Sequence, residues 1–276
     1  MESTKSPRSK LNGPALSKLS MNHYRLHRLL LTLTITLGTL LPASVTAQDR
    51  VIVRPRRVVI TRSGKEVRDF PERRKAVVRY PVVLGLTDPT VLRRLQATLR
   101  MKNIFDSSLV DYRTEFGLLS FDYQVNYNKN YLLDISFNQE TEGAYPDTQN
   151  KHYLLSLKNG LVIKAANAFN QESLATLTGL ANEKLKGEVK ELIKVVAEDK
   201  DSDAEQKSAL TDQLNQLEFK RENLDEFSVS DKGVTFLYDA GFPHVIQALQ
   251  PDGQYFFSFA ELRPHIKSSG PLAVFK

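Results

Sequence analysis

Two changes in the spacing of apolar residues constrain the fold of this chain more than any other sequence feature. Over residues 77–84 and again over 118–163 the apolar residues occur in short runs that alternate with polar residues, which is typical of β-strands. At residue 172 the spacing changes to three and four residues, and an apolar stripe follows as far as residue 196. Alternation then returns over 227–259. This order of strands, helices and strands predicts an α+β fold with one or more antiparallel sheets, packed by one long helix and one or two shorter helices.

Local signals predict the individual elements. A first helix is expected near 89–101, because Pro89 follows the capping residue Asp88 and apolar residues then recur at helical spacing. A second short helix is expected over 204–217. The alternating runs predict strands at 77–84, 118–127, 131–137, 152–157, 161–163, 227–230, 233–238 and 255–259. Short links between them, such as 128–130, favour an antiparallel meander.

Residues 1–47 have the composition of a secretory signal peptide. The apolar run 29–41 follows the basic residues Arg25 and Arg28 and precedes small residues that end at Ala47, which is the order of a charged region, an apolar core and a cleavage site. The run holds 13 residues, whereas a membrane-spanning helix needs about 20. We therefore expect cleavage near Ala47, an extracytoplasmic location in the periplasm or the medium, and no membrane span afterwards. An uncleaved anchor is the alternative.

The distribution of charge argues against a nucleic-acid partner. The chain contains 38 Lys and Arg and 32 Asp and Glu, and its net charge is +6. Six basic residues and one acid lie in 1–47, and eleven basic residues and four acids lie in 48–79. Residues 80–276 therefore contain 21 basic and 27 acidic residues, a net charge of −6. A phosphate backbone requires clustered Lys and Arg on one face, so nucleic acid is not an expected partner.

The same composition suggests the domain boundaries. Residues 48–79 combine arginines, prolines and two short β-type runs, which fits either a basic linker or a lone hairpin. A flexible tether is the preferred interpretation, because an isolated two-stranded hairpin is only marginally stable. The globular domain is expected over 80–267, as two sub-modules of about 80–165 and 170–267, with a C-terminal tail at 268–276.

No catalytic or metal-binding constellation is evident in the sequence. The chain has no cysteine, which excludes disulfides and thiolate metal sites. Three histidines follow residue 47, namely His152, His244 and His265, and none of them pairs at the spacing of metal ligands. The sequence also lacks a Gly-x-Ser-x-Gly elbow and a glycine-rich phosphate loop. We therefore expect no metal, no cofactor and no enzymatic activity.

Two loops differ from this background and are candidate partner-binding segments. The first, 143–148, combines a flexible glycine, a rigid proline and an aromatic ring, and an ordinary turn is the alternative. The second, 238–253, is a long apolar connection between two strands, and completion of the core is the alternative. The candidate partner-binding residues in the two loops are Tyr145, Pro146, Asp147, Thr148, Tyr238, Asp239, Phe242 and His244.

The order of motifs over roughly 80–267 resembles a pair of bacterial extracytoplasmic modules. These modules occur in the ectodomain of the RsiV anti-sigma factors and beside the catalytic domain of PdaC-type peptidoglycan deacetylases. The segments that carry the resemblance are 80–83 (YPVV), 123–128 (YQVNYN), 132–137 (LLDISF), 142–148 (EGAYPDT), 157–160 (LKNG), 227–234 (FSVSDKGV), 238–253 and 257–262 (FSFAEL). The resemblance implies an α+β ectodomain and, for the RsiV branch, the binding of lysozyme as a signal.

These observations favour an exported, non-enzymatic binding module of the bacterial cell envelope. Its expected ligand is a lysozyme, another wall-active protein or a wall glycan, bound by the loops 143–148 and 238–253. Two alternatives are a carbohydrate-active hydrolase of peptidoglycan and a structural envelope protein held by its arginine-rich segment. A fold resemblance does not by itself decide between these functions.

Overall fold

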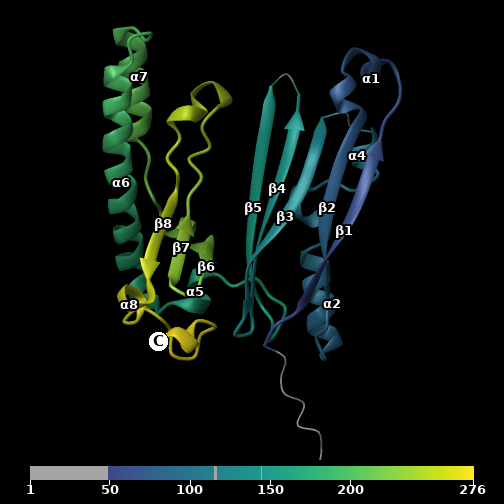
Figure 1. Ribbon diagram of the computed structural model, residues 1–276. Helices are drawn as coiled ribbons and strands as arrows, with labels where there is room; N and C mark the ends of the chain where they lie inside the picture. The colour runs from purple at the N-terminus through teal and green to yellow at the C-terminus, as the bar shows by residue number, and fades with distance from the viewer. Residues whose placement is uncertain (1–48, 115–116, 144) are drawn as a thin grey trace, which may run out of the picture. The chain divides into compact units, whose positions relative to one another are not determined.

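The computed structural model describes residues 49–114, 117–143 and 145–276, and these form an α+β fold with two sheets (Figure 1). The first sheet has five strands in the order β1-β2-β3-β4-β5, and the second has three in the order β6-β7-β8. The strands are β1 Ile52–Thr61, β2 Lys75–Leu84, β3 Leu118–Lys129, β4 Leu132–Glu142, β5 Pro146–Ser156, β6 Phe227–Val229, β7 Gly233–Leu237 and β8 Gln254–Ser258. The predicted fold class is confirmed.

One long helix and several short ones accompany the sheets. The α-helices are α1 Lys65–Asp69, α2 Pro89–Thr98, α3 Met101–Phe105, α4 Asp111–Thr114, α5 Ala165–Ala168, α6 Leu174–Glu198, α7 Ala204–Asn215 and α8 Phe259–Leu262. The 3₁₀ turns are η1 Pro71–Arg74, η2 Gln171–Ser173, η3 Arg221–Asp225, η4 His244–Leu249 and η5 Ala273–Phe275. Among the described residues, no helix has the length and apolar character needed to cross a membrane.

One strand pair departs from the predicted antiparallel meander. Strand β2 pairs in parallel with β3 at Val77 and Val78, which lie opposite Ser120 and Phe121. Parallel neighbours require a crossover rather than a tight turn, and α2, α3 and α4 lie in the connection between these two strands. The first of these helices begins as predicted, because the Asp88 carboxylate caps it by accepting a hydrogen bond from the backbone N–H of residue 90 at 2.7 Å.

The interpretation of residues 48–79 as a flexible tether is wrong for the described part of that segment. Strand β1 pairs with β2 along its whole length, from Ile52 opposite Leu84 to Thr61 opposite Lys75. The hairpin alternative is closer, but β2 also pairs with β3 and so supplies the third strand that a lone hairpin lacks. The first sheet therefore begins before the predicted domain boundary at residue 80.

A buried arginine fixes the connection between β1 and β2. The guanidinium of Arg62 donates to the carbonyl oxygen of Tyr112 at 2.9 and 3.2 Å, to that of Arg73 at 2.9 Å and to that of Leu118 at 3.1 Å. Burial lowers the pKa of Arg62, and the carbonyl acceptors replace the water that the cation has lost. The connection between β1 and β2 is therefore held by polar contacts inside the protein.

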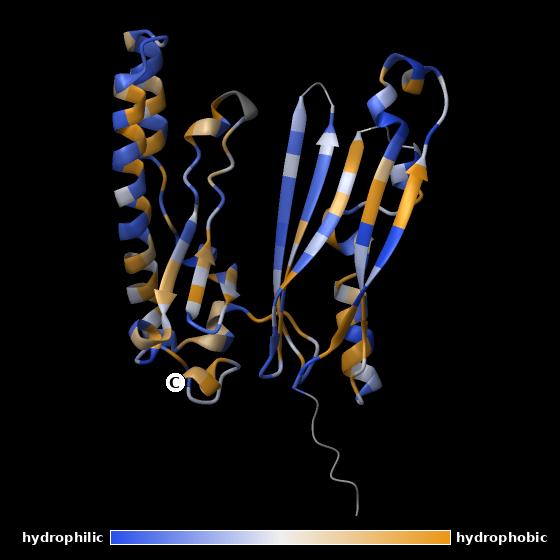
Figure 2. Cartoon of the chain, viewed as in Figure 1, coloured by the Kyte–Doolittle hydropathy of each residue, from blue (hydrophilic) through white to orange (hydrophobic). Residues whose placement is uncertain are grey.

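The first sheet contributes to two hydrophobic cores, one from each face. Leu133, Ile135 and Phe137 of β4 pack in a core with residues of α2, α3 and α4. Leu132, the neighbour of Leu133, belongs instead to a core that contains residues of the second sheet and of the α6 stripe. Because side chains alternate along a strand, one strand serves both cores. Figure 2 shows the apolar positions that form them.

Two smaller predictions also need correction. Residues 161–163 form no strand, and Val162 makes only an isolated bridge to Leu155. Residues 268–276 are packed rather than solvated: Leu272 is buried, and the ring of Phe275 stacks on Phe259 with 4.0 Å between centroids. The predicted signal peptide and its cleavage site lie outside the described residues.

Gly253 lies where the two ends of the long 238–253 connection meet. Its φ is +67°, and an added Cβ would lie 1.9 Å from the carbonyl oxygen of Tyr238. Gly241 has a similar φ of +64°, but an added Cβ there would meet nothing within 4 Å. A comparison of alanine variants at Gly241 and Gly253 therefore distinguishes the cost of the left-handed backbone, which both share, from the cost of steric overlap, which only Gly253 has.

We predict that Gly241→Ala lowers the free energy of unfolding by about 1–2 kcal/mol, the cost of a left-handed backbone for an L-residue. Gly253→Ala is expected to cost about 1–3 kcal/mol more, because the overlap forces the backbone to shift. Urea denaturation of both variants measures the difference. Equal losses would show that the contact with Tyr238 does not constrain the loop.

Candidate functional site

A buried carboxylate joins the two sheets. Asp134 on β4 is fully buried, and its Oδ1 lies 2.8 Å from the donating Nδ2 of Asn126 and 2.7 Å from Nε2 of His152. Its Oδ2 accepts hydrogen bonds from Ser228 Oγ at 2.8 Å and from the backbone N–H of Val229 at 2.7 Å. Since Ser228 and Val229 belong to β6, one side chain connects three strands of the first sheet to the edge of the second.

The Asp134 network has the geometry of a structural contact. Each carboxylate oxygen has two partners, and the His152 side chain is only 8% exposed. Asn126 also donates to Ser136 Oγ at 2.7 Å, so the network reaches toward the open part of the same sheet face. A buried polar network stabilises a fold when every member is satisfied. We therefore assign it to holding the two sheets together.

We predict that Asp134→Asn lowers the free energy of unfolding by about 3 kcal/mol or more, because an amide group then faces donors that lose their acceptor in a buried site. The matched control is Asp147→Asn, at an exposed position, which should change stability by no more than about 0.5 kcal/mol. Urea denaturation is the measurement. A loss no larger than that of the control would mean that the network contributes little.

Beyond the network, toward the β4–β5 turn, the same sheet face is polar. Strand residues that lie opposite one another point to the same face, and alternate residues share a face along each strand. The residues placed together by this register, which we call the polar face, are Ser120, Asp122, Gln124, Ser136, Asn138, Glu140, Thr148 and Asn150. Figure 2 shows the hydrophilic character of the first part of β5, which ends in buried apolar residues.

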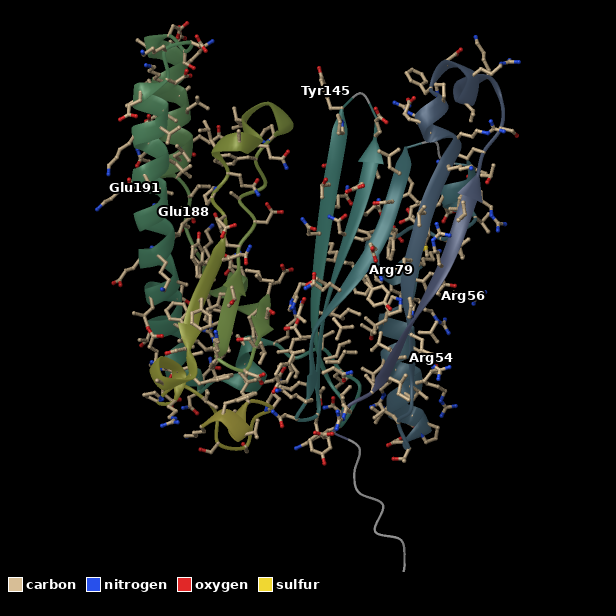
Figure 3. All side chains as sticks on the ribbon, viewed as in Figure 1. Arg54, Arg56, Arg79, Tyr145, Glu188 and Glu191 are labelled. Carbon is tan, nitrogen blue, oxygen red and sulfur yellow. The ribbon has the colours of Figure 1, made fainter. Side chains whose placement is uncertain are left out.

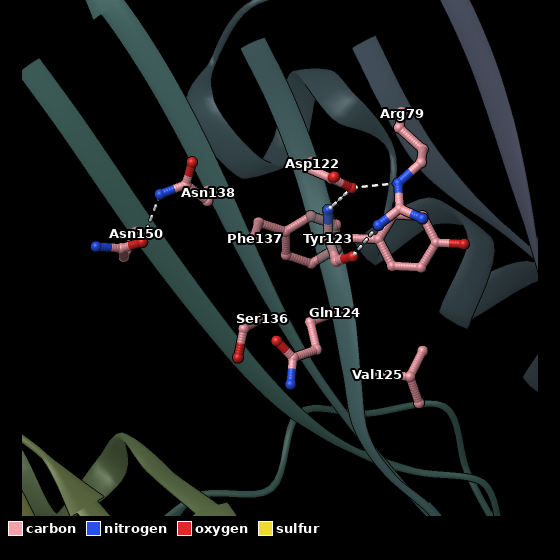
Figure 4. A pocket seen from close by; sticks show the side chains of 9 residues that line it. All are labelled: Arg79, Asp122, Tyr123, Gln124, Val125, Ser136, Phe137, Asn138 and Asn150. Atoms are coloured by element: carbon pink, nitrogen blue, oxygen red, sulfur yellow. Dashed lines mark hydrogen bonds and ion pairs between the residues drawn. The ribbon is translucent and has the colours of Figure 1, made fainter. Parts of the chain in front are cut away.

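A cavity of about 560 Å³ lies on the polar face (Figure 4). Arg79 lies at one side of it, with Nε 2.5 Å from Asp122 Oδ1 and an N–H donating to the carbonyl oxygen of Tyr123 at 3.1 Å. The hydrogen bond that Arg79 donates to Asp122 raises the pKa of Arg79. At the other side Asn138 donates to the Oδ1 of Asn150 at 3.1 Å. The lining thus combines a paired charge with uncharged amide groups.

This chemistry suits an uncharged ligand that is rich in hydroxyl and amide groups. The cavity volume falls in the range of about 300–1,000 Å³ that is usual for small-ligand sites. Asn, Gln and Ser side chains both donate and accept hydrogen bonds, and the Arg79–Asp122 pair has no net charge. Among the described lining residues Asp122 is the only carboxylate, whereas hydrolysis of a glycosidic bond usually requires two. In the described ranges no three His, Asp or Glu residues are grouped to hold a metal ion.

The first predicted loop lies at the end of the β4–β5 hairpin (Figure 3). Tyr145 is 65% exposed and immediately precedes β5. Pro146, Asp147 and Thr148 are strand residues rather than loop residues, paired opposite 142, 141 and 140. Only Thr148 of the four belongs to the polar face, and Asp147 accepts a hydrogen bond from the amide of its strand neighbour Gln149 at 3.2 Å.

The second predicted loop is closed by its own hydrogen bonds. Asp239 accepts from Gln250 Nε2 at 3.1 Å, and the side-chain Oε1 of Gln250 accepts from the backbone N–H of Phe242 at 3.1 Å. Tyr238 and Phe242 are partly buried against the core, which agrees with the alternative that this segment completes the core. His244 begins the η4 turn. Asp239 and Phe242 are thus brought together, while none of the hydrogen bonds described for Asp147 or Asp239 joins the two predicted loops.

Glu188 on α6 anchors the end of the second loop. Its carboxylate accepts hydrogen bonds from the backbone N–H of Asp252 and from the Tyr255 hydroxyl, the latter at 3.2 Å. Burial, together with the charge of Glu188, raises the pKa of the Tyr255 hydroxyl, which therefore remains a donor. The long amphipathic helix thus positions the 238–253 connection as well as covering the sheet.

Apart from Thr148, the residues of the polar face were not predicted as site residues from the sequence. The polar residues at 120, 122 and 124 alternate with apolar ones, and this alternation predicts a strand but does not by itself indicate a binding site. The signal available in the sequence was that three consecutive strands all place amides and hydroxyls on their polar sides. Their meeting around one cavity depends on the strand register, which a single sequence does not specify.

The fold is similar to solved structures of DUF3298 family proteins. A member of this family from Bacteroides fragilis NCTC 9343 aligns with a TM-score of 0.51 at 12% identity, covering 83% of this chain and 99% of that chain. A DUF3298 family protein from Pseudomonas aeruginosa PAO1 aligns with a TM-score of 0.50 at 12% identity, covering 79% and 94%. At this identity the likeness shows a shared fold. No family model matches the sequence, and no curated protein matches it.

Proposed function

We propose that this protein is a non-enzymatic binding module of the bacterial cell envelope that recognises an uncharged wall glycan on the polar face. The observation that carries the proposal is the cavity of about 560 Å³, around which three strands place amides and hydroxyls. Sugar hydroxyl and N-acetyl groups donate and accept hydrogen bonds as these side chains do. The predicted export of the chain and its resemblance to wall-associated modules support an envelope ligand.

The absence of a free acid/base pair in the cavity supports binding rather than hydrolysis. Asp122 is held by Arg79 and by the backbone N–H of Tyr123, which donates to it at 2.6 Å. The acids of the two predicted loops, Asp147 and Asp239, lie on different parts of the fold and each accepts an amide hydrogen bond within its own segment. Neither Asp147 nor Asp239 lines the cavity, so neither joins Asp122 as the second carboxylate that a glycosidase places beside the scissile bond.

The double variant Asn138→Ala/Asn150→Ala is expected to weaken binding of N-acetylglucosamine oligomers, an uncharged wall-type glycan, by about tenfold or more, because it removes two amide groups from the cavity wall. Gln149→Ala is the matched control, since it removes an exposed amide from the same strand on the opposite face. Calorimetry with the purified protein measures the affinities. Unchanged binding by the double variant would show that the glycan does not bind at the polar face. Release of shortened glycan by the wild type, but not by Asp122→Asn, would instead favour a hydrolase.

A second candidate ligand is a lysozyme, favoured by the exposed ring of Tyr145 at the end of the hairpin beside the polar face. Exposed tyrosines are common anchors of protein interfaces. The net charge of residues 48–276 is only +1, but the exposed acids Glu140 and Asp147 of this hairpin would attract a basic lysozyme and increase the association rate.

Tyr145→Ala is expected to reduce lysozyme capture in a pull-down by about tenfold, with Phe256→Ala, a second exposed aromatic on β8, as the control. Added salt should weaken the complex, because part of the attraction is between exposed charges. Equal capture by wild type and Tyr145→Ala, or no capture by either folded protein, would exclude a lysozyme site at this hairpin.

A further inference from the structure

A second cavity, of about 410 Å³, lies between β2 and the corner where α2 meets α3. We call it the apolar groove. Its apolar lining is formed by residues 80–83 of β2, by Leu99 and Met101 at the helix corner, and by Leu109 and Val110 of the following loop. Leu99 and Met101 are buried in the core of the first sheet, so the floor of the groove is continuous with that core.

Hydrogen bonds fix each wall of the apolar groove. Gln96 of α2 donates to the carbonyl oxygen of Val83 at 3.0 Å, which ties the helix to the strand. The Asn103 side chain donates to the carbonyl oxygen of Ala97 at 2.6 Å across the helix corner. The backbone N–H of Ser108 donates to Asp111 at 2.7 Å and orders the loop that carries the third wall. The groove is therefore a preformed site rather than a gap between mobile segments.

The rim of the groove is basic. Arg100 and Lys102 line it and are exposed. On the neighbouring strand Arg54 and Arg56, also exposed, lie opposite Val82 and Tyr80, and the Arg56 guanidinium is 5.8 Å from the centre of the Tyr80 ring (Figure 3).

No carboxylate balances these four cations within the groove. The described lining residues include no Asp or Glu, and none of the four has an ion pair among the described residues. Asp111 interacts electrostatically with Lys102, but hydrogen bonds with Ser108 are the main cause of its lowered pKa. The positive rim is therefore available to an anion.

We propose that the apolar groove binds a fatty acid, with the acyl chain against Leu99, Met101 and Leu109 and the carboxylate at the basic rim. An apolar groove of this volume can hold a single hydrocarbon chain, and transfer of each methylene from water into it is favourable. A carboxylate head group then requires cations at the mouth of the groove, where Arg100 and Lys102 lie. An amphipathic anion satisfies both features at once, whereas a glycan satisfies neither.

The groove suits a single acyl chain better than a membrane surface. Val110 is 65% exposed, and the other apolar lining residues are buried or half-buried. Insertion into a bilayer uses apolar side chains that protrude as a patch, whereas this lining is recessed. The inference is independent of the proposed glycan function, because none of the polar-face residues lines the groove.

The test is displacement of a dansyl-labelled fatty acid from the purified protein by dodecanoate, below its micelle concentration. We expect dodecanoate to displace the probe and dodecanol to do so about tenfold more weakly, since the alcohol lacks the charge. Arg100→Glu/Lys102→Glu should weaken dodecanoate binding about tenfold or more and leave dodecanol binding unchanged. Lys190→Glu/Lys200→Glu changes the net charge by the same amount at two exposed positions, one in α6 and one in the loop after it, and should retain wild-type binding.

A second variant pair tests the apolar part of the groove. Val110→Asp places a charge at the mouth and should weaken both ligands, while Val195→Asp, at an exposed apolar position of α6, should weaken neither. Circular dichroism confirms that each variant is folded. The proposal is overturned if folded wild type does not bind dodecanoate, if dodecanol binds equally well, or if the rim variant binds as wild type does. Binding to phosphatidylglycerol vesicles without binding to monomeric dodecanoate would also overturn it, in favour of a membrane surface.

Discussion

The arrangement of this protein depends on the satisfied carboxylate of Asp134. Asp134 lies on one face of β4 between an apolar part and a polar part: Leu132 belongs to the core shared with the second sheet, and Ser136 is the first β4 residue of the polar face. A buried charge is tolerated there only because donors from both sheets surround it. A register shift in β3 between Val125 and Tyr127 contributes to the same transition, since it places Tyr127 opposite Asp134 and within the shared core.

Strand β2 separates two surfaces of opposite chemistry. Arg79 reaches Asp122 at the polar cavity, and its neighbour Tyr80 lines the apolar groove. Charge is neutralised at the first surface by an ion pair and left uncompensated at the second, so the ligands proposed for the two surfaces differ in charge. Strand β1 pairs with β2 along its length. The segment predicted as a tether therefore supports the strand that contributes to both surfaces.

Elements with strong local signals were predicted from the sequence, and elements that depend on distant partners were not. The Asp88 cap and the apolar stripe of α6 need only their own neighbours, and both predictions are confirmed. Strand β1 was interpreted as a tether because its arginines and prolines are typical of a solvated segment. Its assignment as a strand depends on β2, which pairs with β1 on one side and with β3 on the other. The donors to Asp134 lie 8, 18, 94 and 95 positions away in sequence, so their convergence cannot be derived from any local pattern.

The buried guanidinium of Arg62 has a consequence for how such a chain tolerates mutation over evolutionary time. Its acceptors are the main-chain oxygens of Tyr112, Arg73 and Leu118, and every amino acid supplies that atom. Substitutions at the acceptor positions therefore leave the contact available, while replacement of the arginine removes it. A contact directed at the backbone therefore depends on the identity of one residue, the arginine, and not on the side chains of its acceptors.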